Sequence, residues 1–306
     1  MIALMLADQA KSASKSKGSA GSVVAVGRVI NVSSLCRLLE VSRAGYYAHL
    51  GKPAKARRCQ DRVLGDQIEA DFELSRGTYG SPRLVACLHD RGLRCGKTRV
   101  RRLMDERELQ VAQKRRYKPR TTQSGHGLAA APNVLATMPL TTQLDQQWVS
   151  DITYLPTKEG YLYLAGTLDK HSRMVVGWQT SKTLDSEVVL SAARKAFKTR
   201  DPVAGLIYHS DQGCQYAGWE CRNLLKEHQS LQSMSRRGNC YDNATMESFW
   251  ATLKTECFGL YIPATRAEAR TMVFDYVEGF YNGHRKHSSL GMLSPMQFEQ
   301  KLRKIA

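Results

Sequence analysis

Three acidic residues, Asp151, Asp211 and Glu247, stand where a carboxylate is costly unless it does chemistry. Asp151 interrupts a segment rich in β-branched and aromatic residues, Asp211 ends an apolar segment, and Glu247 falls in the first turns of a predicted helix. The intervals between them contain 59 and 35 residues. A carboxylate that ends a hydrophobic strand is destabilising unless it is paired or holds a cation. The three residues are therefore candidate metal ligands.

Carboxylate oxygens on rigid elements suit Mg²⁺, which keeps several waters and takes its other ligands from substrate phosphates. If the strands carrying Asp151 and Asp211 are neighbours, the two residues lie about 5 Å apart, and each raises the pKa of the other unless a cation neutralises them. Two metal ions about 3.5–4 Å apart catalyse phosphoryl transfer. No Ser/His/Asp or Cys/His grouping has a comparable context, and the sequence has no P-loop motif.

Each candidate also has a simpler explanation. Asp151 could be an exposed position on an alternating strand, and Asp211 a turn residue. Glu247 could complement the dipole of a helix in its first turn. Asp169 and Glu220 would compete for the acidic role if spacing were the only criterion.

The predicted helix that carries Glu247 has a second candidate, Lys254. Apolar residues at helical spacing predict its buried face: Met246, Trp250, Leu253 and Cys257. Glu247 and Lys254 lie on another face, roughly 10 Å apart along the axis, which is too far for an ion pair. Lys254 is thus available to a DNA phosphate near the carboxylates, or is simply a solvated lysine.

These residues need a rigid frame, and the second half of the sequence predicts one. Segments 147–155, 161–169 and 174–180 predict three antiparallel strands joined by short turns. The elements that follow are a helix at 186–198, a strand at 205–211, a helix at 216–228, a strand at 231–235 and helices at 243–258 and 266–281. This order favours an α/β fold, a mixed sheet with helices on its faces.

Positive charge is concentrated in the first half of the chain. The 306 residues carry a net charge of +17. Residues 1–140 hold 25 Lys+Arg against 11 Asp+Glu, whereas residues 141–306 hold 20 against 17. Such asymmetry favours a polyanion-binding module, for nucleic acid above all, joined to a separate core.

The basic half predicts two helix pairs. In residues 31–49, Ser33 or Ser34 caps a first helix and Ser42 caps a second. A connecting helix at 56–75 is followed by a second pair at 82–91 and 97–108. Two helices across a short turn have the shape of a helix-turn-helix.

Basic residues in and after the last of these helices are candidate DNA contacts: Arg99, Arg101, Arg102, Lys114, Arg115 and Arg116. A solvated helix face with a charged tail is the alternative interpretation of this cluster.

Composition divides the chain into five segments. They are a flexible lead at 1–28, a helix-turn-helix at 29–55, a connecting helix with a second helix-turn-helix-like basic region at 56–118, a linker at 119–144 and a catalytic core with C-terminal helices at 145–306.

Several protein classes are excluded by composition. The eight cysteines form no C-x-x-C or zinc-finger spacing, so neither a disulfide scaffold nor a structural zinc site is expected. No apolar run is long enough for a membrane helix, and the N-terminus is a poor secretory signal. Scattered single thiols suit a reducing compartment, so we expect a cytoplasmic protein without a membrane partner.

Four ordered blocks resemble the orfB-type transposases of bacterial insertion sequence family three, which share a DDE catalytic core with retroviral integrases. The blocks are residues 148–178, 209–216, 236–256 and 281–299, and they include the D-x35-E spacing from Asp211 to Glu247. Residues 76–110 resemble the second helix-turn-helix that precedes this core.

The resemblance implies an RNase H-like core in which Asp151, Asp211 and Glu247 bind two Mg²⁺ ions, with Mn²⁺ as a substitute. It implies a DNA contact for Lys254 and places Arg285 and His287 near the active site, as further candidate DNA contacts.

The partners that it implies are DNA, as terminal inverted repeats and as target, and further copies of the chain in a dimer or larger synaptic complex. An upstream helix-turn-helix protein, joined by a frameshift, is a further implied partner. The implied place is the bacterial cytoplasm, at the nucleoid.

Two rival functions remain open at this point. One is a DNA-binding regulator whose integrase-like core has lost activity, against which the presence of all three acids counts. The other is a plain RNase H-type nuclease with the same metal chemistry, which the helix-turn-helix candidates and the block at 281–299 disfavour.

Overall fold

The computed structural model describes residues 22–25, 28–50, 56–111, 130–138, 141–236 and 243–304. The chain divides into two compact units, residues 1–66 and 67–306. Three predicted DNA contacts, Lys114, Arg115 and Arg116, lie outside the described residues. No described helix is both long and apolar enough to cross a membrane.

The first unit begins with a hairpin. Strands β1 (Ser22–Ala25) and β2 (Arg28–Asn31) pair antiparallel. The described part of residues 1–28 is therefore paired strand rather than the flexible lead that its composition suggested. The physical reason is the β-branched residues of the two strands, Val23, Val24, Val29 and Ile30, since such residues favour paired extended backbone.

The predicted helix pair follows as α2 (Val32–Leu38) and α3 (Arg43–Leu50). The first cap differs from the prediction, because the side chain of Asn31 accepts a hydrogen bond from Ser33 N at 2.9 Å. The second cap is as predicted, since Ser42 Oγ accepts from Gly45 N at 3.0 Å.

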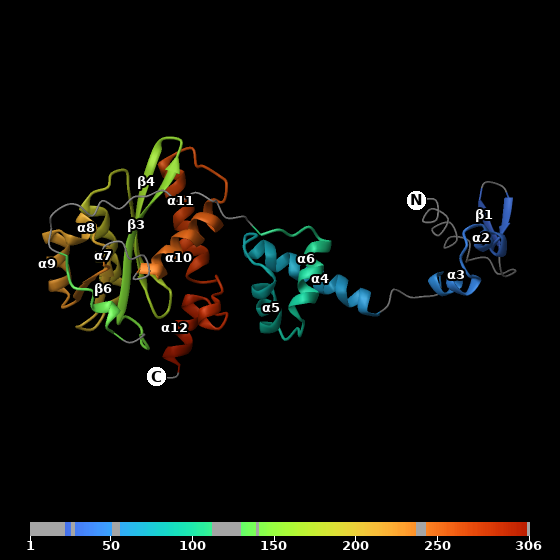
Figure 1. Cartoon of the computed structure of the whole chain (residues 1–306), viewed down its shortest axis with the longest axis horizontal. Helices are drawn as coiled ribbons and strands as arrows, with labels where there is room; N and C mark the ends of the chain where they lie inside the picture. The colour runs from blue at the N-terminus through green and yellow to red at the C-terminus, as the bar shows by residue number, and fades with distance from the viewer. Residues whose placement is uncertain are drawn as a thin grey trace. The chain divides into compact units, whose positions relative to one another are not determined.

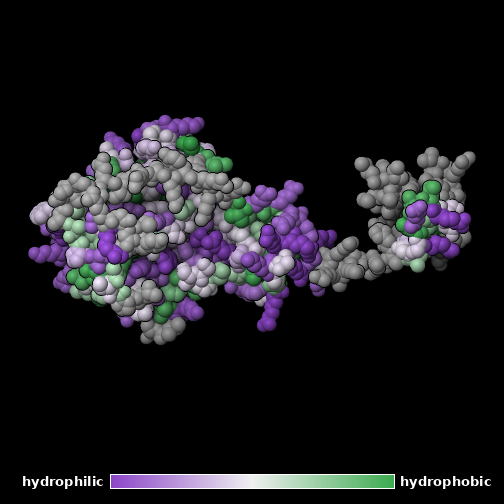
Figure 2. Space-filling model, in the orientation of Figure 1, coloured by the Kyte–Doolittle hydropathy of each residue, from purple (hydrophilic) through white to green (hydrophobic). Residues whose placement is uncertain are grey.

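The basic helical region consists of α4 (Ala56–Leu74), α5 (Ser81–Asp90) and α6 (Lys97–Glu106). Helices α5 and α6 form the second predicted pair, and their apolar stripes are buried: Leu84, Leu88, Val100, Leu103 and Met104. Hydrophilic side chains predominate on the visible face of this region (Figure 2).

A five-stranded mixed sheet forms the centre of the second unit. Its order is β5-β4-β3-β6-β7, with β3 (Gln147–Thr157), β4 (Gly160–Asp169), β5 (Val175–Ser181), β6 (Ile207–Ser210) and β7 (Leu231–Met234). The first three strands are antiparallel, as predicted, while β6 runs parallel to both β3 and β7.

Helices cover both faces of this sheet (Figure 1). On one side lie α7 (Ser186–Arg200), α8 (Cys214–Ala217) and α9 (Trp219–Glu227). On the other lie α10 (Ala244–Leu253), α11 (Arg266–Tyr276) and α12 (Pro295–Arg303). The fold is thus an α/β, RNase H-like core preceded by helix pairs.

Three predicted helices are modified where the sequence had suggested a single element. The helix expected at 266–281 ends as α11 at Tyr276 and passes into a π-helical turn, η4 (Val277–Tyr281). The helix expected at 216–228 is divided at Gly218 into α8 and α9. The helix expected at 243–258 passes from α10 into a π-helical turn, η3 (Lys254–Phe258). Such turns are frequent at functional sites, and this one begins at the candidate Lys254.

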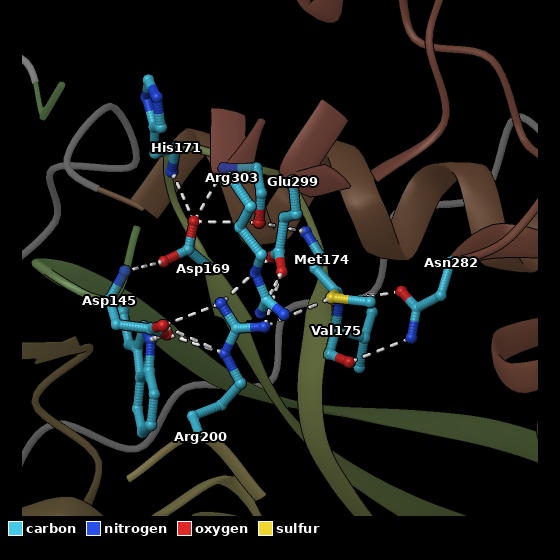
Figure 3. A network of polar contacts seen from close by, with 11 residues as sticks. Asp145, Asp169, His171, Met174, Val175, Arg200, Asn282, Glu299 and Arg303 are labelled. Atoms are coloured by element: carbon cyan, nitrogen blue, oxygen red, sulfur yellow. Dashed lines mark hydrogen bonds and ion pairs between the residues drawn. The ribbon is translucent and has the colours of Figure 1, made fainter. Parts of the chain in front are cut away.

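A buried polar network ties the ends of the core together (Figure 3). Arg200, the last residue of α7, donates to Asp145 ahead of β3 and to Glu299 on α12, each at 2.7 Å. Asp169, at the end of β4, accepts from Asp145 N at 2.7 Å. The network fixes the start of β3 and therefore the strand that carries Asp151.

Candidate active site

Pairing of β3 with β6 brings Asp151 and Asp211 together. The parallel register aligns Trp148 with Tyr208 and Val149 with His209. Continued by two residues, it sets Asp211, which directly follows β6, beside Asp151. Neighbouring strands lie about 4.8 Å apart. The strands are therefore neighbours, which was the condition on which the predicted carboxylate pair depended.

The electrostatic environment of Asp151 reflects this arrangement. Burial is the main reason that the pKa of Asp151 rises to about 7, and the charges of Asp211 and Glu247 raise it further. Hydrogen bonds from Ile152 N and from Trp250 oppose the rise. Asp151 is half-buried, so it is not the exposed strand position of the simpler interpretation. The charges of Asp211 and Glu247 thus both act on Asp151.

Trp250 orients the Asp151 carboxylate, because its Nε1–H donates to Asp151 Oδ2 at 3.0 Å. The indole reaches this position by crossing β4 at Gly166, the residue paired with Asp151 in the β3–β4 register. A Cβ at Gly166 would lie only 2.8 Å from Trp250 Cη2. The absence of a side chain at Gly166 is therefore what lets Trp250 reach the acid.

Asp211 is held by a local turn. Its Oδ1 accepts a hydrogen bond from Gly213 N at 2.9 Å, which fixes the carboxylate at the sheet edge just before α8. Asp211 is half-buried, and its charge acts on Asp151. Asp211 is thus a turn residue, as the simpler interpretation suggested, and it also lies beside Asp151.

Glu247 lies on α10, in the helical layer that covers the face of the sheet opposite α7. It lies in the first turn of α10 and is exposed. The N-cap of this helix, Asn243, is buried and makes a long contact of 3.5 Å from Nδ2 to Ser150 O, next to Asp151. The start of α10 is thereby placed over β3, on the side of the carboxylate pair.

The three carboxylates are suitable ligands for a divalent cation, although they do not lie as close together as they would around a bound metal ion. Among the described residues, no three His, Cys, Asp or Glu side chains stand close enough to hold a metal ion. The three side chains nevertheless offer oxygen ligands that Mg²⁺ prefers. Their mutual repulsion, which raises the pKa of Asp151, is what a bound cation would relieve.

Lys254 lies beside the same site and is not a solvated lysine. It is half-buried, and its Nζ stands 4.9 Å from the ring centroid of Tyr154 on β3. Burial lowers the pKa of Lys254, while the charge of Asp151 opposes that effect. A phosphate near the carboxylates would therefore find an ammonium group already in position.

Arg285 has a carboxylate partner inside the protein. Its side chain is buried, and Nε and one terminal nitrogen each donate to Glu256 at 2.6 Å. His287 accepts from the other terminal nitrogen of Arg285 at 3.4 Å. Direct contact of Arg285 with DNA would require it to share or exchange Glu256, so this geometry favours a structural role for Arg285 over the predicted DNA contact.

The described basic residues on α6 are divided by exposure. Arg101 and Arg102 are exposed, whereas Arg99 is half-buried. Arg102 pairs with Glu106 one turn later, at 2.5 Å. Exposed pairs of this kind contribute little to stability, so Arg102 can exchange its partner for a phosphate.

The competing acids lie elsewhere. Asp169 is fully buried and accepts hydrogen bonds from Asp145 N and Ser172 N, each at 2.7 Å, which makes it a structural turn residue. Glu220 is exposed in the first turn of α9. Trp250 and Gly166 were not identified as site residues from the sequence. Only their non-local contact gives them a role, and no motif signals it.

Family comparisons agree with this architecture. Integrase core domain families match residues 141–240 and 228–295, and an HTH-like domain family matches residues 59–117. The chain is 40% identical over 272 residues to an uncharacterized 31 kDa protein of insertion element IS600 from Shigella sonnei, covering 89% of this chain and 100% of that protein.

Two further relatives are named as transposases. The transposase of IS904 from Lactococcus lactis is 38% identical, covering 81% of this chain and 98% of the relative. Transposase InsF of IS3A from Escherichia coli K12 is 36% identical, covering 89% of this chain and 94% of the relative.

Solved structures similar to this chain include retroviral integrases. The magnesium complex of the HTLV-2 integrase catalytic core, in its trimeric form, has a TM-score of 0.40 and 15% identity, covering 51% of this chain and 97% of that one. A chain of the simian T-cell lymphotropic virus intasome, solved in complex with the PP2A regulatory subunit B56 gamma, has a TM-score of 0.44 and 15% identity. The match covers 70% of this chain and 69% of that one.

Proposed function

This chain belongs to the IS3 family of bacterial insertion-sequence transposases, and from that premise we propose that it cuts and joins DNA strands at the ends of its own mobile element. Membership places it among proteins of DNA transposition and integration. The proposed reaction is metal-dependent hydrolysis of a phosphodiester, followed by transesterification to target DNA.

In this proposal Asp151, Asp211 and Glu247 hold two Mg²⁺ ions, for which Mn²⁺ substitutes. When bound, the metal pair supplies an activated attacking oxygen and a stabilised leaving oxygen. Trp250 keeps the Asp151 carboxylate turned into the site through its hydrogen bond. Lys254, beside Tyr154, binds a phosphate oxygen of the DNA strand and so orients it.

One observation carries the proposal. The parallel pairing of β3 with β6 sets Asp211 beside Asp151, and Glu247 on α10 adds its charge to the same carboxylate. A carboxylate whose pKa is raised by burial and by two neighbouring acids, as that of Asp151 is, is typical of a site that binds cations.

We further propose that the basic helix pairs hold the element ends. The division is the predicted one, with helix-turn-helix regions at 29–55 and 56–118, a linker at 119–144 and a catalytic core at 145–306. Exposed Arg101 and Arg102 on α6 would contact phosphates. Pairing of two ends requires at least a dimer, and an upstream helix-turn-helix protein joined by frameshift would complete end recognition in the bacterial cytoplasm, at the nucleoid.

Strand transfer tests this function. A labelled duplex carrying the element end is incubated with supercoiled plasmid and Mg²⁺ or Mn²⁺, with and without EDTA. Wild type is compared with Glu247→Gln and with Glu220→Gln, a matched substitution of an exposed acid on α9. The proposal predicts joined product that needs metal, disappears with Glu247→Gln and persists with Glu220→Gln.

The other outcomes separate the rivals. Nicking without joining would support the nuclease. Binding of DNA with neither nicking nor joining, even after fusion to the upstream frame, would support the regulator. Equal activity of wild type and Glu247→Gln would refute the assignment of the third carboxylate.

A further inference from the structure

A second polar site lies on α10, away from the carboxylates. A cavity of about 430 Å³ is bounded by α5, α10 and the segment after η4 (Val277–Tyr281). Thr245, Ser248 and Thr252 line it from α10 at spacings i, i+3 and i+7, which is one stripe of a helix. Glu247 is not on that stripe, so the two sites use different faces of one helix.

Three guanidinium groups converge on this cavity, from Arg83 on α5, Arg173 in the turn before β5, and Arg285. No acidic residue lines the cavity in the described part of the chain. Behind the wall, the Glu256 carboxylate contacts Arg285 at 2.6 Å and Arg83 at 3.5 Å. One carboxylate that contacts two of the three arginines leaves excess positive charge.

Arg173 is the arginine with the weakest partner in this group. Its NH1 donates to the neutral hydroxyl of Thr245 at 2.9 Å. Its backbone has φ of 62°, in the left-handed region that disfavours non-glycine residues. Strain of this kind is frequent at ligand sites, and here it accompanies a guanidinium half-exposed at the cavity wall.

The pKa of His287 reflects the positive charge around the cavity. Burial and the charges of Arg285, Arg83 and Arg173 lower the pKa of His287 to about 3. The imidazole is therefore neutral near pH 7. Burial is the main cause of this shift, and the three arginine charges that add to it show that the potential around His287 is positive, which stabilises an anion.

We propose that this cavity binds a backbone phosphate of the DNA substrate through Arg173 and Arg83, with hydroxyls of Ser248 and Thr252 as further donors. This inference rests on the proposed function. Guanidinium groups match phosphate oxygens in bidentate geometry. The wall joins α5, from the HTH-like domain, to the helix that carries Glu247, so a phosphate here would register bound DNA against the active site.

Helix α5, which carries Arg83, is held in place by contacts with the C-terminal part of the chain. Tyr79, just before α5, donates to His284 O at 2.9 Å and accepts from Lys286 N at 2.8 Å. Arg76 and Asp275 form an ion pair at 2.6 Å across the same junction. Arg83 is thus carried by a packed element.

Salt-dependent DNA binding tests the proposal. The affinity for a duplex of about 30 base pairs of arbitrary sequence is measured by fluorescence anisotropy over a salt series, since phosphate contacts are independent of sequence. Arg173→Ala should weaken binding about tenfold and reduce the slope of log affinity against log salt by about 0.9. Arg270→Ala, an exposed arginine on α11, serves as the matched control.

Thr252→Asp is the second variant, because it places a negative charge in the cavity and leaves the arginines intact. It should weaken DNA binding at least as much as Arg173→Ala. Thermal melting verifies that each variant is folded. If the Arg173 variant does not fold, the Thr252 variant decides the question.

Three results would overturn the inference. The first is equal affinity and slope for Arg173→Ala and Arg270→Ala, and the second is unchanged binding in Thr252→Asp. The third is calorimetric binding of inorganic phosphate that needs Arg173 while DNA affinity does not, which would assign the cavity to a free anion. Metal-dependent joining by wild type in the strand-transfer assay, lost with Glu247→Gln, would leave the proposed function standing in each case.

Discussion

At the scale of single residues, Asp151 holds a carboxylate in a place that favours its neutral form. Burial and two neighbouring carboxylates raise its pKa from 3.8 to about 7. Below pH 4 the acid is protonated in both folded and unfolded chains. Between pH 4 and 7 the folded chain binds the proton more tightly, so the stability that this group contributes is lost as the pH rises through 7.

We therefore predict that Asp151→Asn stabilises the metal-free protein at pH 8 but not at pH 4. The full shift corresponds to about 4 kcal/mol, which we reduce to about 2 kcal/mol because the side chain is only half-buried. Urea unfolding in EDTA at several pH values measures this difference, with Glu220→Gln as control. A stability difference that stays constant across pH would contradict the prediction.

At the scale of elements, the site depends on how closely α10 packs against the sheet. Trp250 crosses β4 at Gly166 and so reaches Asp151 on β3. A helix, two strands and a carboxylate are thus joined through one indole ring. The position of Glu247 one turn earlier on α10 depends on the same contact.

Gly166→Ala should separate these elements. The new methyl group would overlap Trp250, and such overpacking costs about 1–3 kcal/mol. Strand transfer should fall by more than the loss of folded protein explains, since Asp151 loses its hydrogen-bond donor. Gly283→Ala is the control, because a Cβ there meets no atom within 4 Å. Similar melting temperatures and similar activity for the two variants would refute this role of Gly166.

The sequence predicted elements better than contacts. Alternation in residues 147–155 and 161–169 gave strands close to β3 and β4, because such patterns are local. Asp151 and Asp211 could also be predicted as candidate metal ligands, because they are acids that interrupt or end apolar segments. The Gly166–Trp250 contact was not, since it joins residues far apart in the chain.

The same limit applies to Arg285, for which the family resemblance implied a DNA contact. Its basic type is visible in the sequence, whereas its partner Glu256 becomes its neighbour only after folding. Arg173 was missed for the same reason, because the sequence shows only a turn at this position. The sequence shows the chemical type of a side chain, whereas its interaction partners are determined by the tertiary structure.

At the scale of the whole molecule, Arg200 closes the core. It ties α7 to Asp145 ahead of β3 and to Glu299 on α12 (Figure 3). Glu299 and Arg200 are both buried, so neither charge is well solvated without the other. The C-terminal helix is thereby attached to the strand that carries the first carboxylate.

Arg200→Met should destabilise the protein by about 3–5 kcal/mol, because it leaves the buried Glu299 carboxylate with only its longer contact to Arg303, at 3.6 Å. Arg194→Met, at an exposed ion pair with Glu187 on the same helix, should change stability by less than about 0.5 kcal/mol. Denaturant unfolding of the two variants gives both values. Equal losses would show that the network is not what holds the core closed.

The central claim, that Asp151, Asp211 and Glu247 form one metal site, is tested most directly by Mn²⁺ binding. Electron paramagnetic resonance of free Mn²⁺ gives the affinity of the full chain without DNA. We predict that Asp151→Asn, Asp211→Asn and Glu247→Gln each weaken binding by about tenfold or more, whereas Glu220→Gln leaves it unchanged. Mn²⁺ affinity that is the same in all five proteins would contradict the account.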